Sequence, residues 1–292
     1  MKAAPFSYAR ASSIAEACEW LRRDGDDVKL IAGGQSLVPM MAMRLTRPKR
    51  LIDVNEIGAL KFVALEAGAA RTGACTRQCV IERDDALAEK VPLLRQALAW
   101  VGHAQTRNRG TVGGSLAHAD PAAELPLAAQ VLQSTIVLRS AAGVRSVSAS
   151  DFFTGPLTTA AKADECLEEI QWPVWREPRA GSSFTEVSRR HGDFAMVAAA
   201  AQVALDGEGR CTRASFGVGG GGSAPRVFPE IAALLAGTRL EEAAVKEATR
   251  AAAKEVDFYG DLHASAEYRR HLAEVLAARA LRAACDQAKS RN

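Results

Sequence analysis

The sequence predicts an α+β protein of two domains, and three observations support this fold class. Over residues 1–176, short strand-like apolar runs mix with helical stretches without regular alternation. The segment 172–178 then carries two prolines within six residues, which neither a central strand nor a helix tolerates. Beyond it, three strand-like stretches precede three alanine-rich helical stretches. We therefore expect domains at 1–176 and 177–292.

Length and composition limit the classes of protein to which this chain can belong. The 292 residues suffice for about two domains, and 48% hydrophobic with 24% charged residues is typical of a folded globular protein. Basic and acidic residues, 37 against 34, are interspersed, which argues against a dedicated DNA-binding protein. Only 5% of residues are aromatic, which argues against stacking of single-stranded bases.

The sequence also indicates a cellular compartment. No apolar run approaches the ~20 residues of a membrane span, and the first residues lack the apolar core of a secretory signal. We expect a cytoplasmic protein. The scattered cysteines form no CxxC pair and are expected to be reduced, with no metal site in this chain. They are Cys18, Cys75, Cys79, Cys166, Cys211 and Cys285.

The first domain is predicted to have two parts. About residues 1–55 form a βαβ-like unit preceded by a helix, which a capping box of Ser13 and Glu16 starts and Gly25 ends. The unit has strands over 28–32 and 51–54 and a helix over 36–43. Residues 56–176 mix helices over 92–100 and 122–132 with short strands near Phe62, Ala70, Val137, Val144 and Leu167.

The second domain is predicted to be a three-stranded antiparallel sheet packed on helices. A turn at 206–209 separates the second strand from the third. The strands are expected over 183–187, 194–205 and 211–218, and the helices over 229–235, 241–256 and 265–288. The basic cluster Arg269, Arg270 and His271 is expected on a solvated helix face.

Two Gly-Gly turns carry the functional signal. They lie in 32–36 and 111–115, each beside small hydroxyl or amide residues. Such turns let successive N–H groups cradle a phosphate. Neither contains the lysine of a Walker site. A single Gly-Gly pair is more simply interpreted as a tight turn, whereas two such loops together suggest clamps on one pyrophosphate ligand, such as a dinucleotide. A GxGxxG at 217–222 is rejected, because prolines rather than a crossover helix follow it.

Several polar residues near these turns have more than one interpretation. Arg107 and Arg109 could face phosphate, contact a partner's carboxylates or be solvated. His118 and Asp120 could form a dyad, or His118 could be a hydrogen-bonded loop residue. Glu124 could cap a helix or receive a ribose hydroxyl. The charged turn 189–193 is a solvated hairpin or the edge of a ligand pocket.

The segments AGGQSLVPMMAMRL (32–45) and RNRGTVGGSLAHADPAAELP (107–126) resemble the FAD-binding medium subunit of the molybdenum hydroxylases. That family includes relatives of carbon monoxide, nicotinate, nicotine and xanthine dehydrogenases. SRRHGDFA (188–195) and HASAEYRRHLAEVLAARAL (263–281) are similar to its C-terminal domain, so the resemblance covers nearly the whole chain.

The resemblance implies a two-part FAD-binding domain of the vanillyl-alcohol-oxidase (PCMH) type, followed by the C-terminal α+β domain. One flank of the pyrophosphate and the ribityl chain would contact Leu30, Ile31, Ala32, Gly33, Gly34, Gln35, Ser36 and Leu37. The other flank would contact Thr111, Val112, Gly113, Gly114 and Ser115. Glu124 would bind an adenosine ribose hydroxyl, and Val101 would touch the cofactor ahead of the second loop. Leu167 would lie against the isoalloxazine through its backbone, and Thr185 would sit at the outer edge of that ring.

The same resemblance implies an electron-transfer subunit with non-covalent FAD and no catalytic residue of its own. An iron–sulfur small subunit with [2Fe-2S] clusters would supply electrons, a molybdopterin large subunit would hydroxylate the substrate, and the assembly would be a dimer of heterotrimers. A free-standing FAD-dependent oxidoreductase and a scaffold without nucleotide are the alternatives. The chain has Thr185 where some relatives have lysine and Glu124 in place of the commoner aspartate, and it lacks the cysteine-rich insertion of 4-hydroxybenzoyl-CoA reductases.

Overall fold

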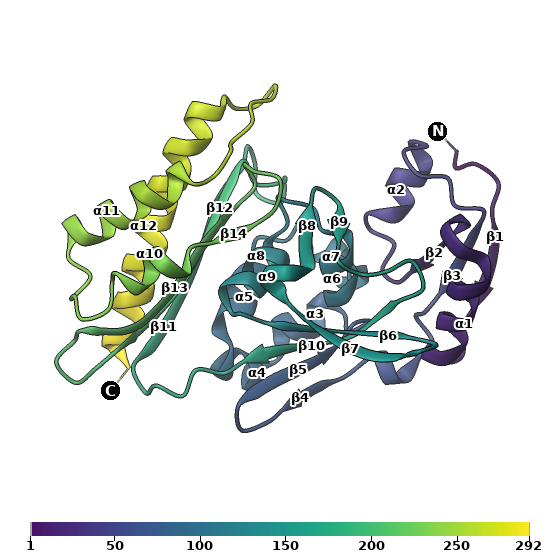
Figure 1. Ribbon diagram of the computed structural model, residues 1–292, viewed down its shortest axis with the longest axis horizontal. Helices are drawn as coiled ribbons and strands as arrows, with labels where there is room; N and C mark the ends of the chain where they lie inside the picture. The colour runs from purple at the N-terminus through teal and green to yellow at the C-terminus, as the bar shows by residue number, and fades with distance from the viewer. Residues whose placement is uncertain (1, 292) are drawn as a thin grey trace.

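The computed structural model describes residues 2–291 and contains three sheet-based units in a row (Figure 1). A small parallel sheet lies at the N-terminal end, a five-stranded antiparallel sheet lies in the middle, and a helix-covered antiparallel sheet lies at the other end. Helices and strands are mixed throughout, which confirms the predicted α+β class.

The first unit is a three-stranded parallel sheet in the order β1-β3-β2. Its predicted helix begins as expected, because the Ser13 side chain accepts a hydrogen bond from the Glu16 amide at 3.1 Å. The Glu16 carboxylate, however, accepts from Ser12 rather than from Ser13. The elements are β1 Ser7–Arg10, α1 Ile14–Asp24, η1 Gly25–Asp27, β2 Val28–Ile31, α2 Leu37–Ala42 and β3 Arg50–Asp53. Strand β1 was not predicted, because its residues are mostly exposed and show no apolar alternation.

The middle unit is a five-stranded sheet in the order β4-β5-β10-β6-β7 with helices packed on it. Trp172 is fully buried at its centre and donates its indole N–H to Thr72 Oγ1 at 2.9 Å. The strands are β4 Val63–Leu65, β5 Ala69–Gly73, β6 Thr135–Ser140, β7 Gly143–Ser148 and β10 Cys166–Pro173, with a separate pair β8 Phe153–Gly155 and β9 Thr158–Thr159. The helices are η2 Gly58–Leu60, α3 Gln78–Arg83, α4 Asp85–Lys90, α5 Pro92–Leu98, α6 Ala104–Arg109, α7 Val112–His118, α8 Glu124–Val131 and α9 Ala149–Phe152.

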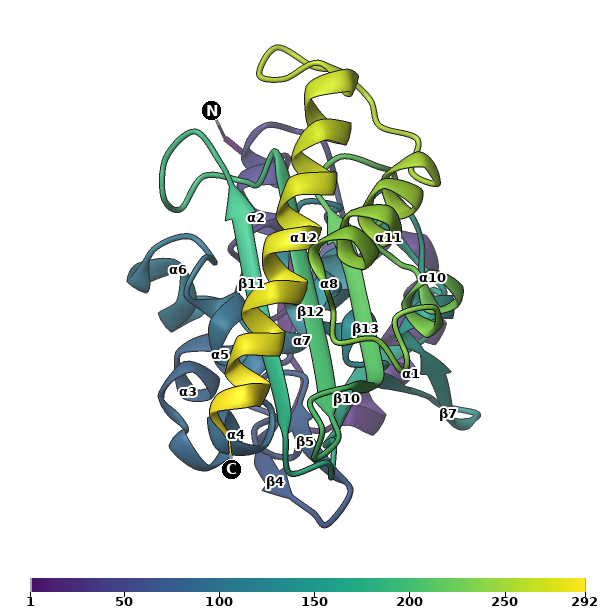
Figure 2. The ribbon, with the colours of Figure 1, turned by 90° about the vertical axis from the view of Figure 1, so that its left-hand side faces the viewer.

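The last unit has the three predicted antiparallel strands and adds a short fourth strand, in the order β11-β12-β13-β14. The helices that follow these strands cover one face of the sheet (Figure 2), and helices of the middle unit pack against the other face. Every residue of β12 is consequently buried. The elements are β11 Ala180–Val187, β12 Val197–Leu205, β13 Cys211–Gly219, β14 Arg226–Val227, α10 Pro229–Ala233, α11 Glu242–Lys254 and α12 Ala266–Ser290.

The expectation that Arg269 is solvated is wrong. Its side chain is buried and donates to the carbonyls of Met196 and Gly220 and to the Asp261 carboxylate. It therefore holds the loop after β13, the GxGxxG segment, against α12. The Gly220 amide in turn donates to Pro121 O at 2.8 Å, so this loop ties the last unit to the middle one. None of the helices within residues 2–291 is long and apolar enough to cross a membrane.

Candidate cofactor site

The two glycine loops predicted from the sequence meet in space. A side chain at Gly33 would place its Cβ 2.4 Å from the carbonyl oxygen of Arg109 and 2.9 Å from the Cα of Gly110. Only glycine permits this approach of two backbones. The loop after β2 thus packs directly on the segment that leads into the second loop, although about 75 residues separate them in sequence.

The first loop presents unpaired backbone donors. Within residues 2–291, no hydrogen-bond acceptor is found for the amides of residues 33–37. Gly34 has a φ of +71°, a left-handed conformation that turns the chain here, and the Gln35 side chain donates to the Gly33 carbonyl at 3.2 Å. Successive free amides around a turn form an anion-binding concavity.

The second loop is built differently. Thr111 caps α7, and its hydroxyl accepts from the Gly114 amide at 3.1 Å. The amides of Val112 and Gly113 donate to Thr76 O and Ala74 O, at 3.0 and 2.9 Å. A Cβ on Gly113 would lie 2.5 Å from that of Ala74. The first amides of α7 are therefore already paired, and this loop anchors the site against the segment after β5.

Two residues that the sequence analysis missed link the loops. The Asn55 side chain donates to Ala32 O at 2.7 Å and accepts from the Arg77 guanidinium at 2.7 Å, and Arg77 also donates to Arg109 O. A signal for Asn55 existed, because it follows β3, and the carboxyl ends of parallel strands meet at one edge of a sheet. Arg77, at the start of α3, had no such signal.

Val101 lies in a turn that Arg107 holds in place. Arg107 forms two hydrogen bonds of 2.9 Å with the Glu82 carboxylate and donates to Val101 O at 3.0 Å. Its side chain is only 14% exposed, so Arg107 is part of an internal ion pair rather than solvated. Arg109, by contrast, is exposed.

The charged turn after β11 lies over this segment. The rings of His191 and Trp100 stack with centroids 5.9 Å apart, and a Cβ on Gly192 would lie 2.6 Å from His103 Cε1. The turn therefore packs on the segment before α6, although its residues 189–191 remain exposed.

The remaining predicted residues lie on four elements: β2, β10, β11 and, for Glu124, α8. Leu30 and Ile31 end β2, and Leu167 lies at a β-bulge of β10, where it packs against the cores of both N-terminal units. Bulges often re-aim side chains next to functional sites. Thr185 pairs with Ala199, so its side chain faces the helix-covered side of the sheet, whereas Glu186 faces the middle unit. Neither Gly loop makes a hydrogen bond to Thr185 within residues 2–291.

Glu124 begins α8 and is buried near Glu186 of β11. Burial first, and the charge of Asp120 to a lesser degree, raise the pKa of Glu124 to about 7. Burial, together with the Glu124 carboxylate, raises the pKa of Glu186 to about 8. Neither Glu186 oxygen has a hydrogen-bond partner within the described chain. This pair of acids lies at the junction of α8 with the last sheet.

His118 and Asp120 do not form a catalytic pair. His118 is the last residue of α7 rather than a loop residue, and Asp120 accepts from the Ala122 amide at 2.8 Å. Residues 2–291 also contain no cluster of three or more His, Cys, Asp and Glu side chains suited to a metal ion.

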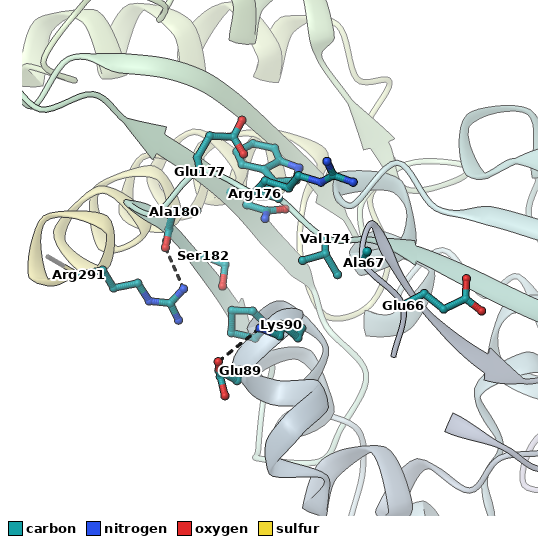
Figure 3. Close-up of a pocket in the computed structure, with 14 residues that line it drawn as sticks. Glu66, Ala67, Glu89, Lys90, Val174, Arg176, Glu177, Ala180, Ser182 and Arg291 are labelled. Atoms are coloured by element: carbon teal, nitrogen blue, oxygen red, sulfur yellow. Dashed lines mark hydrogen bonds and ion pairs between the residues drawn. The ribbon is translucent and has the colours of Figure 1, made fainter. Parts of the chain in front are cut away.

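A separate cavity of about 380 Å³ lies away from both loops. It is bounded by the β4–β5 connection, α4, the segment joining β10 to β11 and the C-terminal end of α12 (Figure 3). Its lining contains three acidic and three basic residues: Glu66, Glu89, Glu177, Lys90, Arg176 and Arg291. None of the predicted cofactor residues lines it.

Comparison with known proteins decides between the interpretations of the loops. Residues 4–175 match the family described as FAD binding domain in molybdopterin dehydrogenase, and residues 182–284 match the CO dehydrogenase flavoprotein C-terminal domain. The chain belongs to the FAD-binding medium subunits of the molybdenum hydroxylases.

Individual members of this family are similar over nearly their whole length. The alpha subunit of the 6-hydroxypseudooxynicotine dehydrogenase complex of Paenarthrobacter nicotinovorans is 36% identical, with 99% of this chain and 97% of that protein covered. The carbon monoxide dehydrogenase medium chain of Afipia carboxidovorans is 34% identical over 98% and 97%. The structure of reconstituted CO dehydrogenase from Oligotropha carboxidovorans superimposes with a TM-score of 0.96 at 33% identity, over 98% of this chain and 100% of that one.

The geometry fits the FAD that this family binds. Five successive amides without protein acceptors suit a pyrophosphate. Gly33 brings them against the segment leading to α7, which encloses the loop from a second side. The chain is thus an oxidoreductase subunit with a FAD-binding domain, and its relatives are subunits of multi-subunit dehydrogenases.

Proposed function

We propose that the chain is the FAD-binding electron-transfer subunit of a heteromeric molybdenum hydroxylase. It would receive electrons from an iron–sulfur partner subunit and pass them to an external acceptor. The observation that carries the proposal is the direct packing of Gly33 on Arg109 and Gly110, which joins the free amides of residues 33–37 to the α7 loop. Bound there, FAD would supply one- and two-electron redox chemistry.

Each predicted residue has a proposed role in this site. The amides of 33–37 would donate to the pyrophosphate, and residues 111–115 would close its other flank. Glu124 would accept from an adenosine ribose hydroxyl, Val101 would touch the cofactor ahead of the second loop, and the backbone of Leu167 would lie against the isoalloxazine. Because the Thr185 side chain faces α12, we place its contact with the ring at the exposed backbone edge of β11, the first strand of its sheet.

The domain division and the assembly belong to the same proposal. We assign the two-part FAD-binding domain to 1–176, with parts at about 1–55 and 56–176, and the C-terminal domain to 177–292. The partners would be an iron–sulfur subunit with [2Fe-2S] clusters and a molybdopterin subunit, in a dimer of heterotrimers with non-covalent FAD. The cysteines are unpaired, which favours the cytoplasm as the compartment.

The test is native purification followed by absorption spectroscopy. We expect visible flavin bands, FAD released by heat or acid, an iron–sulfur shoulder and two co-purifying chains on a denaturing gel. When the complex is first reduced and freed of excess reductant, removal of FAD should abolish its rapid reoxidation by an added acceptor. FAD on a lone chain that turns over a substrate would instead favour the free-standing oxidoreductase. A colourless lone chain that takes up no added FAD would reject both.

A further inference from the structure

A continuous chain of hydrogen bonds joins the two segments that meet at the contact between the glycine loops. It begins at Ala32 O, which accepts from Asn55 Nδ2 at 2.7 Å, and continues from Asn55 Oδ1 to the Arg77 guanidinium, also at 2.7 Å. A second guanidinium nitrogen of Arg77 donates to Arg109 O. This oxygen is the atom on which Gly33 packs. The chain of bonds and the packing contact therefore fix the same two segments relative to each other.

The orientation of Asn55 is determined by its surroundings. Its backbone amide and its Nδ2 both donate to Asp53 Oδ1 at 2.7 Å, and the other Asp53 oxygen accepts from the Tyr8 hydroxyl. With Nδ2 directed at Asp53 and Ala32, Oδ1 is left to accept from Arg77. The first sheet thus holds Asn55, and Asn55 holds Arg77.

Arg77 also supplies a charge that the loops lack. Neither loop contains a lysine, yet a pyrophosphate carries negative charge that basic side chains stabilise. The guanidinium has five N–H donors, and the bonds to Asn55 and Arg109 use two of its nitrogens. Arg77 is partly exposed, and within residues 2–291 its guanidinium donates to a backbone carbonyl and an amide oxygen rather than to a carboxylate.

We propose that Arg77, held by Asn55, is a cofactor-positioning residue that sets the spacing of the two glycine loops and places a positive charge beside the pyrophosphate of FAD. This inference rests on the proposed function, since it assumes that FAD occupies the loops. It assigns a role in FAD binding to a residue at the start of α3, outside both glycine motifs.

The test measures FAD affinity separately from stability. Arg77→Ala, Arg77→Lys and Asn55→Ala are prepared in the full chain, with any chains that co-purify, and FAD is removed. FAD binding is titrated by flavin fluorescence, and thermal unfolding is measured without FAD. Arg83→Ala is the matched control, because Arg83 ends the same helix and is exposed.

We expect Arg77→Ala to weaken FAD binding more than tenfold and Asn55→Ala to weaken it about tenfold, with Arg83→Ala unchanged. Arg77→Lys should recover only part of the loss, because an ammonium keeps the charge but cannot reach Asn55 and Arg109 together. Wild-type affinity in Arg77→Ala, or a lowered unfolding temperature with unchanged affinity, would overturn the inference. Failure of the wild-type protein to bind FAD would instead overturn the proposed function on which it rests.

Discussion

Glu186 on β11 and Glu124 on α8 bury two carboxyl groups near each other where the last sheet packs on the middle unit. Their environments raise the pKa values to about 8 and about 7. An acid whose pKa is higher in the folded than in the unfolded protein binds more protons when folded. For each of these two groups, folding stability therefore falls as pH rises from its unfolded-state pKa to its folded-state pKa. The packing of the last sheet on the middle unit should therefore be less stable at alkaline pH, where both carboxyl groups ionise.

This leads to a prediction about Glu186→Gln. The free energy of unfolding of the wild-type protein should decrease from pH 5 to pH 8.5, by on the order of 6 kcal/mol if both carboxyl groups ionise. Glu186→Gln should flatten much of this decrease and stabilise the protein at pH 8.5, because an amide does not ionise. Urea unfolding of the FAD-free chain at several pH values measures this. Glu247→Gln, at an exposed position of α11, should keep the wild-type profile.

The two adjacent glycines of the second loop should respond differently to alanine. At Gly113 a Cβ meets the backbone and side chain of Ala74 at 2.5–2.8 Å, so the packing of α7 on the segment after β5 must open. At Gly114 the close contact is the Thr111 hydroxyl, at 2.6 Å, so the main loss is the helix cap, about 1 kcal/mol. Urea unfolding should therefore rank Gly113→Ala well below Gly114→Ala in stability. Equal losses would show that α7 shifts freely against Ala74.

Arg107→Ala tests the support of the Val101 turn. Removing the guanidinium leaves Glu82, 27% exposed, without its partner and releases Val101 O, so we expect a loss of about 1–3 kcal/mol. Arg22→Ala is a useful comparison, because Arg22 forms a similar two-bond pair with Glu19 but on the surface. That variant should lose under about 0.5 kcal/mol. Unfolding curves of both variants without FAD give the answer, and similar losses would argue that Arg107 is effectively solvated.

Elements with a periodic apolar pattern were predicted from the sequence, whereas elements positioned by contacts between distant segments were missed. The three long strands and the helices of the last unit were predicted because each has a clear apolar pattern, whereas the two-residue strand β14 was not. Helix α6 buries none of its residues and α7 contains two glycines, so neither has a local helical signal, and their positions depend on packing against other segments.

The same distinction holds at the site. The glycine loops were visible as motifs, but the Arg77 contact to Arg109 O joins residues 32 positions apart and the Asn55 contact joins residues 22 apart. Likewise, nothing local distinguishes Arg107, which is held by Glu82, from Arg109, which is exposed. The sequence identifies the glycine loops, which we propose to bind FAD through their backbone, whereas the side chains that fix those loops are identified only by the fold.

Arg269 supplies the last prediction, because adjacent arginines of α12 provide a matched pair. Arg269 donates to Met196 O at 2.6 Å, Gly220 O at 2.8 Å and Asp261 at 2.6 Å, while its neighbour Arg270 is exposed. Two of these acceptors are backbone carbonyls that no other described donor satisfies, so Arg269→Ala should lose about 2–4 kcal/mol.

Arg269→Lys should lose nearly as much unfolding free energy as Arg269→Ala, because an ammonium cannot replace the planar guanidinium between three separate acceptors. Arg270→Ala should stay within about 0.5 kcal/mol of wild type, as a surface substitution. Urea unfolding gives the three values. In Arg269→Ala, hydrogen exchange should become faster at the Gly220 amide. This amide donates the hydrogen bond to Pro121 O that links the last unit to the FAD-binding domain. If exchange at Gly220 stayed at the wild-type rate, Arg269 would stabilise α12 alone and not the junction.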